Sequence, residues 1–534
     1  MPTNANPGLL RDWIERAAQR APDKPWIVSA TDGRTVSYSQ LRDATRRVAS
    51  FLHRHGIGRN DRVAMLANNS IEHLLCYLGV MSYGATICTV HVEMNRNQLD
   101  SILTRLAPKL VLYQGDLGLD DLLSQVSVPK FPLGDFDHPG DGSFFQAVTQ
   151  CEPGEARTDA APEDDAVILF TSGTGAQPKG VVLDFCEHLG NIDPTADGFG
   201  IGAGDRVYDF RSFNWASAQL LGALVPVNRG ATLVMAEKFS ASRYFQHVRE
   251  HGATVAAGNP TVLNILLNAD DGTERADLPS LRFITSSSAP LTVEEWRRFE
   301  DRFNIPLAQG YGSSETGWIA AIPGEQRRFG TVGRPLAYHD LAVVDAEGRP
   351  LPPGQIGQVE IGGFAGHAYR YLAEDGSVRI NSRGRIRTGD LGMLDPDGFL
   401  RLTGREKELI IRGGAKISPL EIDSFLMQRP ELIEVATVGV PDAIYGEEVV
   451  SYVVARPGTT IDAGELLQFC SDGLPDFKAP KRIIVSDVSL PKTERGKLDR
   501  KALAARWACN SEEAAIAPRA PLPSPLVGEG GEPS

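Results

Sequence analysis

A stretch of hydroxyl side chains and glycines between two apolar runs has the clearest chemical use in this sequence. Ala166 to Phe170 is apolar and has the length of a buried strand. The chain continues as Thr-Ser-Gly-Thr-Gly to Gly175, then reaches Lys179 and a second apolar run from Gly180 to Leu183. Glycines let backbone N–H groups approach a polyanion, the hydroxyls donate further hydrogen bonds, and the lysine adds positive charge. The pattern predicts a loop that holds the phosphates of a nucleoside triphosphate.

Two other interpretations of this stretch compete with the phosphate loop. A P-loop needs a glycine, four residues and then Gly-Lys-Ser/Thr at the start of a helix. Here Gly173 is followed by Pro178-Lys179-Gly180 and an apolar extended run, which excludes that motif. A plain surface turn rich in Gly, Ser and Thr is the other interpretation that the stretch allows by itself.

Composition bounds the class of protein. A chain of 534 residues with 42% hydrophobic and 23% charged residues is typical of a globular protein of about two to four domains. The net charge of -14 argues against a nucleic-acid partner. The six cysteines form no C-x-x-C pair, which argues against a zinc site or a disulfide framework. With no signal-peptide pattern and no apolar run of membrane-spanning length, we expect a cytoplasmic protein that is not an integral membrane protein.

Helix and strand patterns alternate from Leu9 to Tyr113 and again from Arg206 to Phe303. This alternation predicts mainly parallel sheets covered by helices on both faces. Residues 404–510 read as a separate small α+β domain, with a strand expected from Glu408 to Ile411. Residues 511–534 are rich in Pro, Gly, Ala and Glu, and we expect a disordered tail there.

Two further segments have the composition of a ligand-binding loop. The strand pattern from Leu281 to Thr285 leads into Ser-Ser-Ser-Ala-Pro, whose small side chains leave space for a flat ring. Gln309 to Thr316 reads Gln-Gly-Tyr-Gly-Ser-Ser-Glu-Thr, in which Tyr311 offers a stacking face and Glu315 a carboxylate for Mg²⁺ beside phosphates. Each segment alone is equally compatible with an ordinary connection between two elements.

Three charged segments lie nearer the C-terminus. Thr388-Gly389-Asp390 is expected to form a turn, where aspartate is common for structural reasons. Gly404 to Ile410 alternates charges in a way that an ordinary solvated surface would also show. Leu490 to Arg500 contains Pro-Lys-Thr-Glu-Arg-Gly-Lys and by itself resembles an exposed basic loop.

Taken in order, these segments closely resemble the motifs of the adenylate-forming (AMP-binding) superfamily, in its acyl- and aryl-CoA ligase branch. The resemblance covers nearly the whole chain except the tail. It implies an α/β fold with a large N-terminal AMP- and acid-binding domain, 1–403, built of layered mixed and parallel sheets flanked by helices. It also implies that the small C-terminal domain, 404–510, is a mobile lid that carries a catalytic lysine.

The resemblance also implies roles for individual residues. Those expected to contact ATP or AMP are Thr171, Ser172, Gly173, Thr174, Gly175, Ser288, Ala289, Pro290, Gly310, Tyr311, Gly312, Ser314, Asp390 and Arg405. The residues expected to be catalytic are Lys497, Glu315 and Lys179, with Glu315 and Thr174 near Mg²⁺. Lys407 is the expected hinge, and Gly413 and Gly414 are expected to border the tunnel for coenzyme A.

The sequence departs from the superfamily pattern at a few positions. The usual Thr-Gly at the end of the phosphate loop is Gly175-Ala176, and Ser314 replaces a threonine. Many CoA ligases have an aromatic residue followed by histidine where this chain has Phe213-Asn214. We expect Phe213, Asn214 and Trp215 to shape the pocket for the acid.

The resemblance implies that ATP activates a carboxylic acid as an acyl-adenylate with release of pyrophosphate, and that coenzyme A then takes the acyl group. Aromatic, medium-chain, branched and carnitine-like acids are all compatible with the sequence. A carrier protein is the alternative acceptor, and a catalytically inactive ligand-sensing homologue is an alternative of another class. We expect a monomer or homodimer, and the context of Lys497 resembles sites that a lysine acetyltransferase and deacetylase modify in related ligases.

Overall fold

The computed structural model describes residues 6–171, 178–269, 278–363, 368–493 and 498–514. The chain divides into two compact units, residues 1–406 and 407–534. The division falls within a short 3₁₀ helix, Glu406–Glu408. No helix in the described parts of the chain is long and apolar enough to cross a membrane.

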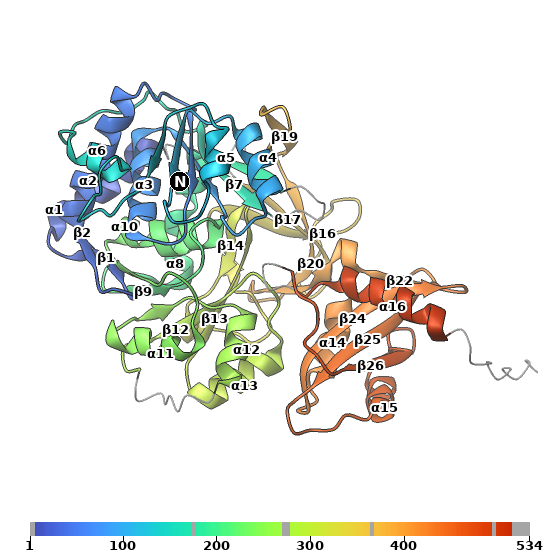
Figure 1. Cartoon of the computed structure of the whole chain (residues 1–534). Helices are drawn as coiled ribbons and strands as arrows, with labels where there is room; N and C mark the ends of the chain where they lie inside the picture. The colour runs from blue at the N-terminus through green and yellow to red at the C-terminus, as the bar shows by residue number, and fades with distance from the viewer. Residues whose placement is uncertain (1–5, 172–177, 270–277, 364–367, 494–497, 515–534) are drawn as a thin grey trace, which may run out of the picture. The chain divides into compact units, whose positions relative to one another are not determined.

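An eight-stranded mixed sheet forms one half of the first unit (Figure 1). Strands β7, β4, β3, β5 and β6 pair in parallel. Beyond β7 the sheet continues with β8, β18 and β19, each antiparallel to the strand before it. In spatial order the strands are β19 (Val378–Arg383), β18 (Ala368–Leu372), β8 (Lys179–Asp184), β7 (Asp165–Thr171), β4 (Thr86–Val90), β3 (Arg62–Leu66), β5 (Leu110–Tyr113) and β6 (Lys130–Pro132).

A nine-stranded mixed sheet forms the other half of this unit. Its central strands, from β1 to β13, pair in parallel, and antiparallel strands close both edges. In spatial order the strands are β15 (Arg334–Pro335), β14 (Gly317–Ala321), β13 (Leu307–Ser313), β12 (Phe283–Ser286), β11 (Val255–Ala256), β9 (Arg206–Asp209), β10 (Thr232–Met235), β1 (Pro25–Ser29) and β2 (Thr35–Ser37).

Helices lie between and outside these two sheets. One large core cluster combines residues of both sheets with residues of α2, α3 and α8, and every residue of α3 is buried. The nine-stranded sheet packs its other face on α11–α13, and the eight-stranded sheet packs its other face on α4 and α5. The helices are α1 (Pro7–Arg20), α2 (Tyr38–Arg54), α3 (Ile71–Tyr83), α4 (Arg96–Leu106), α5 (Asp120–Ser124), α6 (Phe144–Thr149), α7 (Phe185–Gly190), α8 (Ile192–Phe199), α9 (Ala216–Ala218), α10 (Val225–Arg229), α11 (Ala241–Glu250), α12 (Pro260–Asn268) and α13 (Val293–Phe303).

A four-stranded antiparallel sheet completes the first unit. Its order is β16 (His339–Val344), β17 (Gly357–Gly363), β20 (Ile386–Leu394) and β21 (Leu400–Arg405). The second unit is a five-stranded sheet with its own apolar core. Its elements are β22 (Ile410–Arg412), β23 (Ala415–Ile417), α14 (Pro419–Leu426), β24 (Leu432–Asp442), β25 (Gly446–Ala455), α15 (Ala463–Gly473), β26 (Arg482–Ser486) and α16 (Arg500–Ala514).

The predicted fold class, an α/β protein with layered mixed sheets and a small second domain, is confirmed. Several local predictions are wrong. Thr388-Gly389-Asp390 lies inside β20 and is not a turn, because β20 pairs with β17 on one side and with β21 on the other. The strand expected from Glu408 begins at Ile410, and α16 extends to Ala514, into the segment expected to be a tail.

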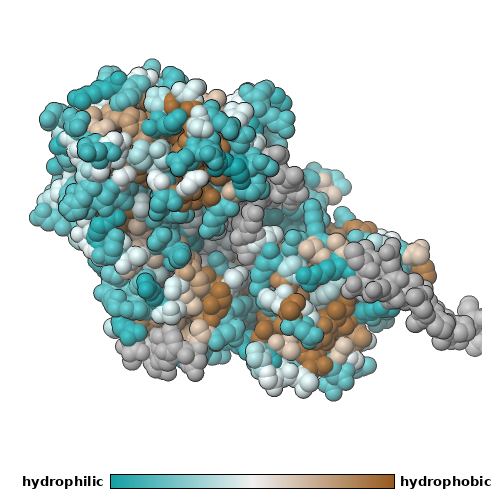
Figure 2. All heavy atoms as spheres, viewed as in Figure 1, coloured by the Kyte–Doolittle hydropathy of each residue, from teal (hydrophilic) through white to brown (hydrophobic). Residues whose placement is uncertain are grey.

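The face of the molecule drawn in Figure 2 is mostly hydrophilic. Among the described residues, most of the exposed large hydrophobic side chains belong to the second unit, and Ile444 is the most exposed of them at 82%.

Candidate active site

Three of the predicted site segments begin at or near the carboxyl ends of strands in the first unit. The phosphate loop follows β7, the Ser-Ser-Ser segment follows β12, and the tyrosine motif begins inside β13. Residues 67–69, which follow β3, hydrogen-bond to residues 210–214, which follow β9. The carboxyl ends of the two large sheets therefore face one another, the usual location of a binding site in open α/β folds.

One cluster consists of a carboxylate held by a phenol and a guanidinium. Asp390 lies opposite Arg405 across the β20–β21 pair, and Nε of Arg405 donates to its Oδ1 at 2.7 Å. The hydroxyl of Tyr311 donates to Oδ2 of Asp390 at 2.5 Å. Burial raises the pKa of the Tyr311 hydroxyl, and the neighbouring carboxylate raises it further, so the hydroxyl is a donor at neutral pH. The cluster fixes one carboxylate beside a partly exposed arginine.

A second cluster joins Glu315 and Lys179 through a residue from another strand. Tyr371 lies on β18, which pairs with β8 directly beside Lys179. Its hydroxyl donates to Oε1 of Glu315 at 3.2 Å, and Nζ of Lys179 lies 5.1 Å from the centroid of its ring. An ammonium at that distance is attracted to the face of an aromatic ring. One tyrosine therefore positions both a carboxylate and a cation.

Tyr369 connects the two clusters. It stands two residues before Tyr371, so both side chains leave β18 on the same face. Burial raises the pKa of the Tyr369 hydroxyl, and the carboxylates of Glu315 and Asp390 also raise it. Tyr369 also packs against the core cluster that contains Tyr311, so it is a neighbour of both clusters.

The Ser-Ser-Ser segment and the glycines of β13 have distinct local geometry. Ser288 has a φ of 73°, in the left-handed region that few non-glycine residues adopt. Ser286 and Ser287 are buried, and neither hydroxyl has a hydrogen-bond partner in the described structure. A Cβ on Gly310 would lie 2.6 Å from atoms of both Phe199 and Trp318, so this glycine is required by packing inside the protein.

The three residues predicted to form the acid pocket occupy different environments. Phe213 is buried in the core. Nδ2 of Asn214 donates to the carbonyl of Ala67 at 3.0 Å. Trp215 is partly exposed, and its ring stacks on that of His91 at 5.5 Å between centroids. Trp215 is the one of the three whose side chain reaches solvent.

Several predicted residues lie outside the described residues or in the second unit. Ser172, Gly173, Thr174, Gly175 and Lys497 lie outside the described residues. Thr171 ends β7, and Ser314 precedes Glu315 in the turn between β13 and β14. In the second unit, Lys407 is exposed in the 3₁₀ helix, and Gly413 and Gly414 form the turn between β22 and β23 with φ of 56° and 86°.

The described residues contain no group of three His, Cys, Asp or Glu that could hold a metal ion. Mg²⁺ in nucleotide-dependent enzymes is commonly held by one or two carboxylates together with substrate phosphates and water. The single carboxylate of Glu315, which is partly exposed and bonded to the same tyrosine that contacts Lys179, fits that arrangement.

The chain matches the AMP-binding enzyme family over residues 14–371 and the AMP-binding enzyme C-terminal domain over residues 421–497. It therefore belongs to the AMP-binding enzyme family, as its motifs predict. The sulfoacetate–CoA ligase of Cupriavidus necator is 32% identical over 91% of this chain and 95% of the relative. The oxalate–CoA ligase of Arabidopsis thaliana is 30% identical over 93% of this chain and 98% of the relative.

Solved structures agree with this assignment. ATP-bound MatB from Rhodopseudomonas palustris superposes with a TM-score of 0.81 at 27% identity and covers 95% of this chain and 99% of that one. Fold and site thus define an AMP-binding enzyme whose relatives include acid–CoA ligases.

Sequence reasoning missed three residues whose side chains contact predicted site residues in the structure. Tyr371 and Asn69 belong to no motif and lie far along the chain from the residues they contact. Gln219 lies six residues after Phe213, but its other partners, Thr89 and Tyr77, are far away in the sequence. No signal in the sequence singles out these residues, because each is recognisable only from its hydrogen bonds in the folded chain.

Proposed function

We propose that this protein is an AMP-forming acid–CoA ligase that activates a carboxylic acid with MgATP and transfers the acyl group to coenzyme A. The observation that carries the proposal is the pair of joined clusters. One contains Glu315 and Lys179 around Tyr371, and the other contains Asp390, Tyr311 and Arg405. Lys179 then supplies a cation for the phosphates, Glu315 a carboxylate for the metal ion, and Asp390 an acceptor for the ribose hydroxyls.

Each group has a task in the first half-reaction. The Asp390 carboxylate accepts hydrogen bonds from the ribose hydroxyls, and Arg405 contacts the same sugar. Lys179 stabilises charge on the departing pyrophosphate, and Glu315 with Thr174 would hold the Mg²⁺ that screens it. Lys497 places an ammonium where the acid's carboxylate attacks the α-phosphate. The protein thus mainly positions reactants and screens charge, as in other phosphoryl chemistry.

The second half-reaction needs a different arrangement of the second unit. We infer that this unit turns about Lys407, which withdraws Lys497 and lets the thiol of coenzyme A reach the acyl-adenylate past Gly413 and Gly414. Lys407 is exposed at the division between the two units, which favours a hinge there. Acetylation of Lys497 would remove its charge and stop adenylation.

The test is AMP release from MgATP over a panel of carboxylic acids, with and without coenzyme A. The panel includes sulfonated and dicarboxylic acids, aryl acids and medium-chain, branched and carnitine-like acids. AMP release that requires both one acid class and coenzyme A supports the proposal and names the substrate. ATP–pyrophosphate exchange without turnover of coenzyme A would favour a carrier protein as acceptor. Neither activity with any acid would favour an inactive ligand-sensing homologue.

A further inference from the structure

Phe213 is held through both of its backbone groups by buried side-chain amides. Oδ1 of Asn69 accepts a hydrogen bond from the backbone N–H of Phe213 at 2.9 Å. Nε2 of Gln219 donates to the backbone carbonyl of the same residue at 2.7 Å. Both side chains are buried, so neither bond competes with water.

The Asn69 amide also contacts the residues that follow strands β9 and β10. Its Nδ2 donates to the carbonyl of Arg211 at 2.9 Å and lies 3.4 Å from that of Phe210. It lies 3.3 Å from the carbonyl of Ala236, which follows β10. One side chain from the eight-stranded sheet therefore connects the ends of two strands of the nine-stranded sheet.

Gln219 is the first residue of a π-helix, Gln219–Leu224, that follows the acid segment. Such wide turns are rare and are frequent at functional sites. Besides the Phe213 carbonyl, Nε2 of Gln219 donates to Oγ1 of Thr89 at 3.0 Å. Oε1 of Gln219 accepts a hydrogen bond from the hydroxyl of Tyr77 at 3.4 Å. The same Tyr77 hydroxyl lies 2.6 Å from Nε2 of His188. Gln219 is thus held in place by groups from three other elements.

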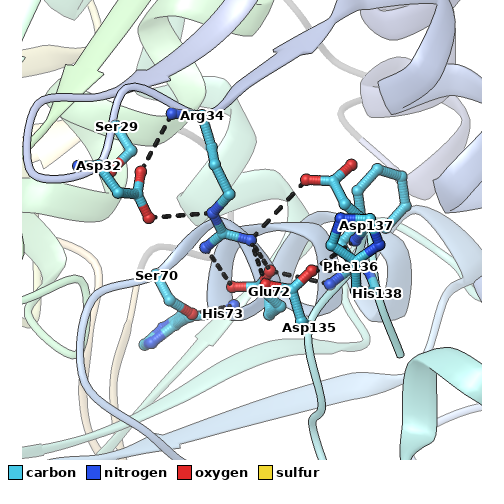
Figure 3. Close-up of polar contacts among 10 residues, drawn as sticks. All are labelled: Ser29, Asp32, Arg34, Ser70, Glu72, His73, Asp135, Phe136, Asp137 and His138. Carbon is cyan, nitrogen blue, oxygen red and sulfur yellow. Dashed lines mark hydrogen bonds and ion pairs between the residues drawn. The ribbon is translucent and has the colours of Figure 1, made fainter. Parts of the chain in front are cut away.

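The turn that carries Asn69 is itself rigidly held. Ser70 caps α3 by accepting a hydrogen bond from the backbone N–H of His73 at 3.0 Å, and Nδ1 of His73 lies 3.0 Å from the carbonyl of Asn68. Glu72 in the first turn of α3 pairs with Arg34 at 2.8 Å. Figure 3 shows Arg34 between the carboxylates of Asp32, Glu72 and Asp135, which ties this turn to two other segments.

The backbone held in this way leads directly to Trp215. The backbone N–H of Trp215 donates to the carbonyl of Ser212 at 3.0 Å, so residues 212–215 form a tight turn around Phe213. A shift of the Phe213 peptides would therefore move the Trp215 ring, which is the exposed member of the acid segment.

From this geometry we propose that Asn69 and Gln219 are positioning residues for the carboxylic-acid site. They set the acid affinity by clamping the Phe213 backbone and, through it, the Trp215 ring. The inference rests on the proposed function, because it assigns the acid to the segment 213–215.

The test compares Asn69→Ala and Gln219→Met with the wild type, using the acid identified by the panel. Loss of either amide leaves a buried backbone group of Phe213 unpaired and loosens the turn. We expect the KM for the acid to rise about tenfold or more in each variant, while the KM for MgATP changes less than about threefold. In the double variant, the KM for the acid should rise by less than the product of the two single increases, because both amides hold the same residue.

Amide hydrogen exchange provides a readout that does not depend on activity. The N–H of Phe213 should exchange faster in Asn69→Ala than in the wild type. The control is Asn60→Gly, which removes a side-chain amide that bonds to Asp164 and to the backbone of Asp165 at the other end of β3. Asn60 has a φ of 60°, which glycine adopts without strain, so this variant should keep the wild-type acid KM.

Equal changes in the two KM values, or an unchanged acid KM in a folded Asn69→Ala enzyme, would overturn the proposal. Unchanged exchange at Phe213 would overturn the clamp itself. A wild type that activates no acid would contradict the proposed function and the acid role of the clamp together. Faster exchange in the variant would then still show that the clamp exists, so the two failures can be told apart.

Discussion

The hydroxyl of Tyr371 donates a hydrogen bond to Oε1 of Glu315 at 3.2 Å, while the ring of the same tyrosine lies 5.1 Å from Nζ of Lys179. A carboxylate expected to hold Mg²⁺ and a cation expected to bind phosphate are thereby positioned by one side chain. The arrangement suggests that the tyrosine matters to the binding of MgATP through two separable contacts.

Tyr371→Phe removes the hydrogen bond and keeps the ring. A hydrogen bond to a charged group contributes about 1.5–3 kcal/mol, so we expect kcat/KM for MgATP to fall about tenfold or more and the Mg²⁺ requirement to rise. Tyr371→Leu should lose more, because it also removes the ring beneath Lys179. ATP–pyrophosphate exchange against MgCl₂ concentration measures both effects.

Tyr338→Phe is the control, since that hydroxyl donates to the carbonyl of Cys186 at 3.3 Å. Wild-type Mg²⁺ dependence in Tyr371→Phe would contradict the prediction.

The carboxylate of Asp390 is predicted to accept hydrogen bonds from the ribose hydroxyls of ATP. If it does, the wild type should have a higher kcat/KM with ATP than with 2′-deoxy-ATP. In Asp390→Ala, kcat/KM should fall about tenfold with ATP but little with the deoxy analogue. Tyr311→Phe, which removes the 2.5 Å bond to Asp390 and leaves the carboxylate in place, should give a smaller fall in kcat/KM with ATP. The measurement is kcat/KM for both nucleotides. An equal loss with both would mean that Asp390 acts on the fold and not on the sugar.

Lys497 is predicted to act in adenylation alone. Lys497→Ala should abolish ATP–pyrophosphate exchange, while thioester formation from supplied acyl-adenylate and coenzyme A should stay within a few-fold of the wild type. Lys492→Ala is a nearby control, because that ammonium pairs with Glu434 at 2.7 Å. Equal loss of both half-reactions would refute the assignment. Enzyme acetylated quantitatively at Lys497 should behave like Lys497→Ala.

Arg211 and Asp209 form a buried ion pair just before the acid segment. Nη2 of Arg211 lies 2.6 Å from Oδ2 of Asp209, and both side chains are almost completely buried. Arg211→Met leaves the carboxylate buried and unpaired, which should reduce the free energy of unfolding by about 3–5 kcal/mol in urea denaturation. Adding Asp209→Asn should recover part of the loss. Arg349→Met, which breaks an exposed pair with Asp345, should change stability by at most about 1 kcal/mol. Similar losses in the two single variants would contradict the argument.

Glu187 is predicted to give a pH-dependent stability. Burial raises the pKa of its carboxyl, and the carboxylate of Asp184 beside it raises the pKa further. A raised folded-state pKa means that the folded protein favours the protonated carboxyl. The stability that this carboxyl contributes is therefore fully present below the ordinary pKa of 4.5 and is lost as the pH rises through the folded-state pKa. Glu187→Gln should therefore have a Tm advantage over the wild type that grows from pH 5 to pH 8. A difference in Tm that stays constant over this range would show that the pKa of Glu187 is not raised.

The sequence was informative wherever the evidence is local. The alternation of apolar patterns predicted strands such as β3, β4 and β5 and the layered α/β fold, because periodicity along the chain reports which face of an element is buried. The order of the motifs predicted the AMP-binding family, which the match over residues 14–371 confirms. The same motifs assigned both Asp390 and Arg405 to the nucleotide, but their pairing across β20 and β21 was found only in the structure, where the expected turn at Asp390 is a strand.

Other features depend on residues that are distant in the chain. Tyr371 meets Glu315 and Lys179 only because β18 pairs with β8, and Asn69 meets Phe213 only because the ends of two sheets face each other. Such contacts leave no periodic or compositional signal, since each partner alone is an ordinary polar residue of a strand or turn. The sequence by itself therefore determined the family, the fold class and the chemical groups of the site. Tertiary packing alone decided which side chains hold those groups in position, because that depends on strand order and register between distant segments.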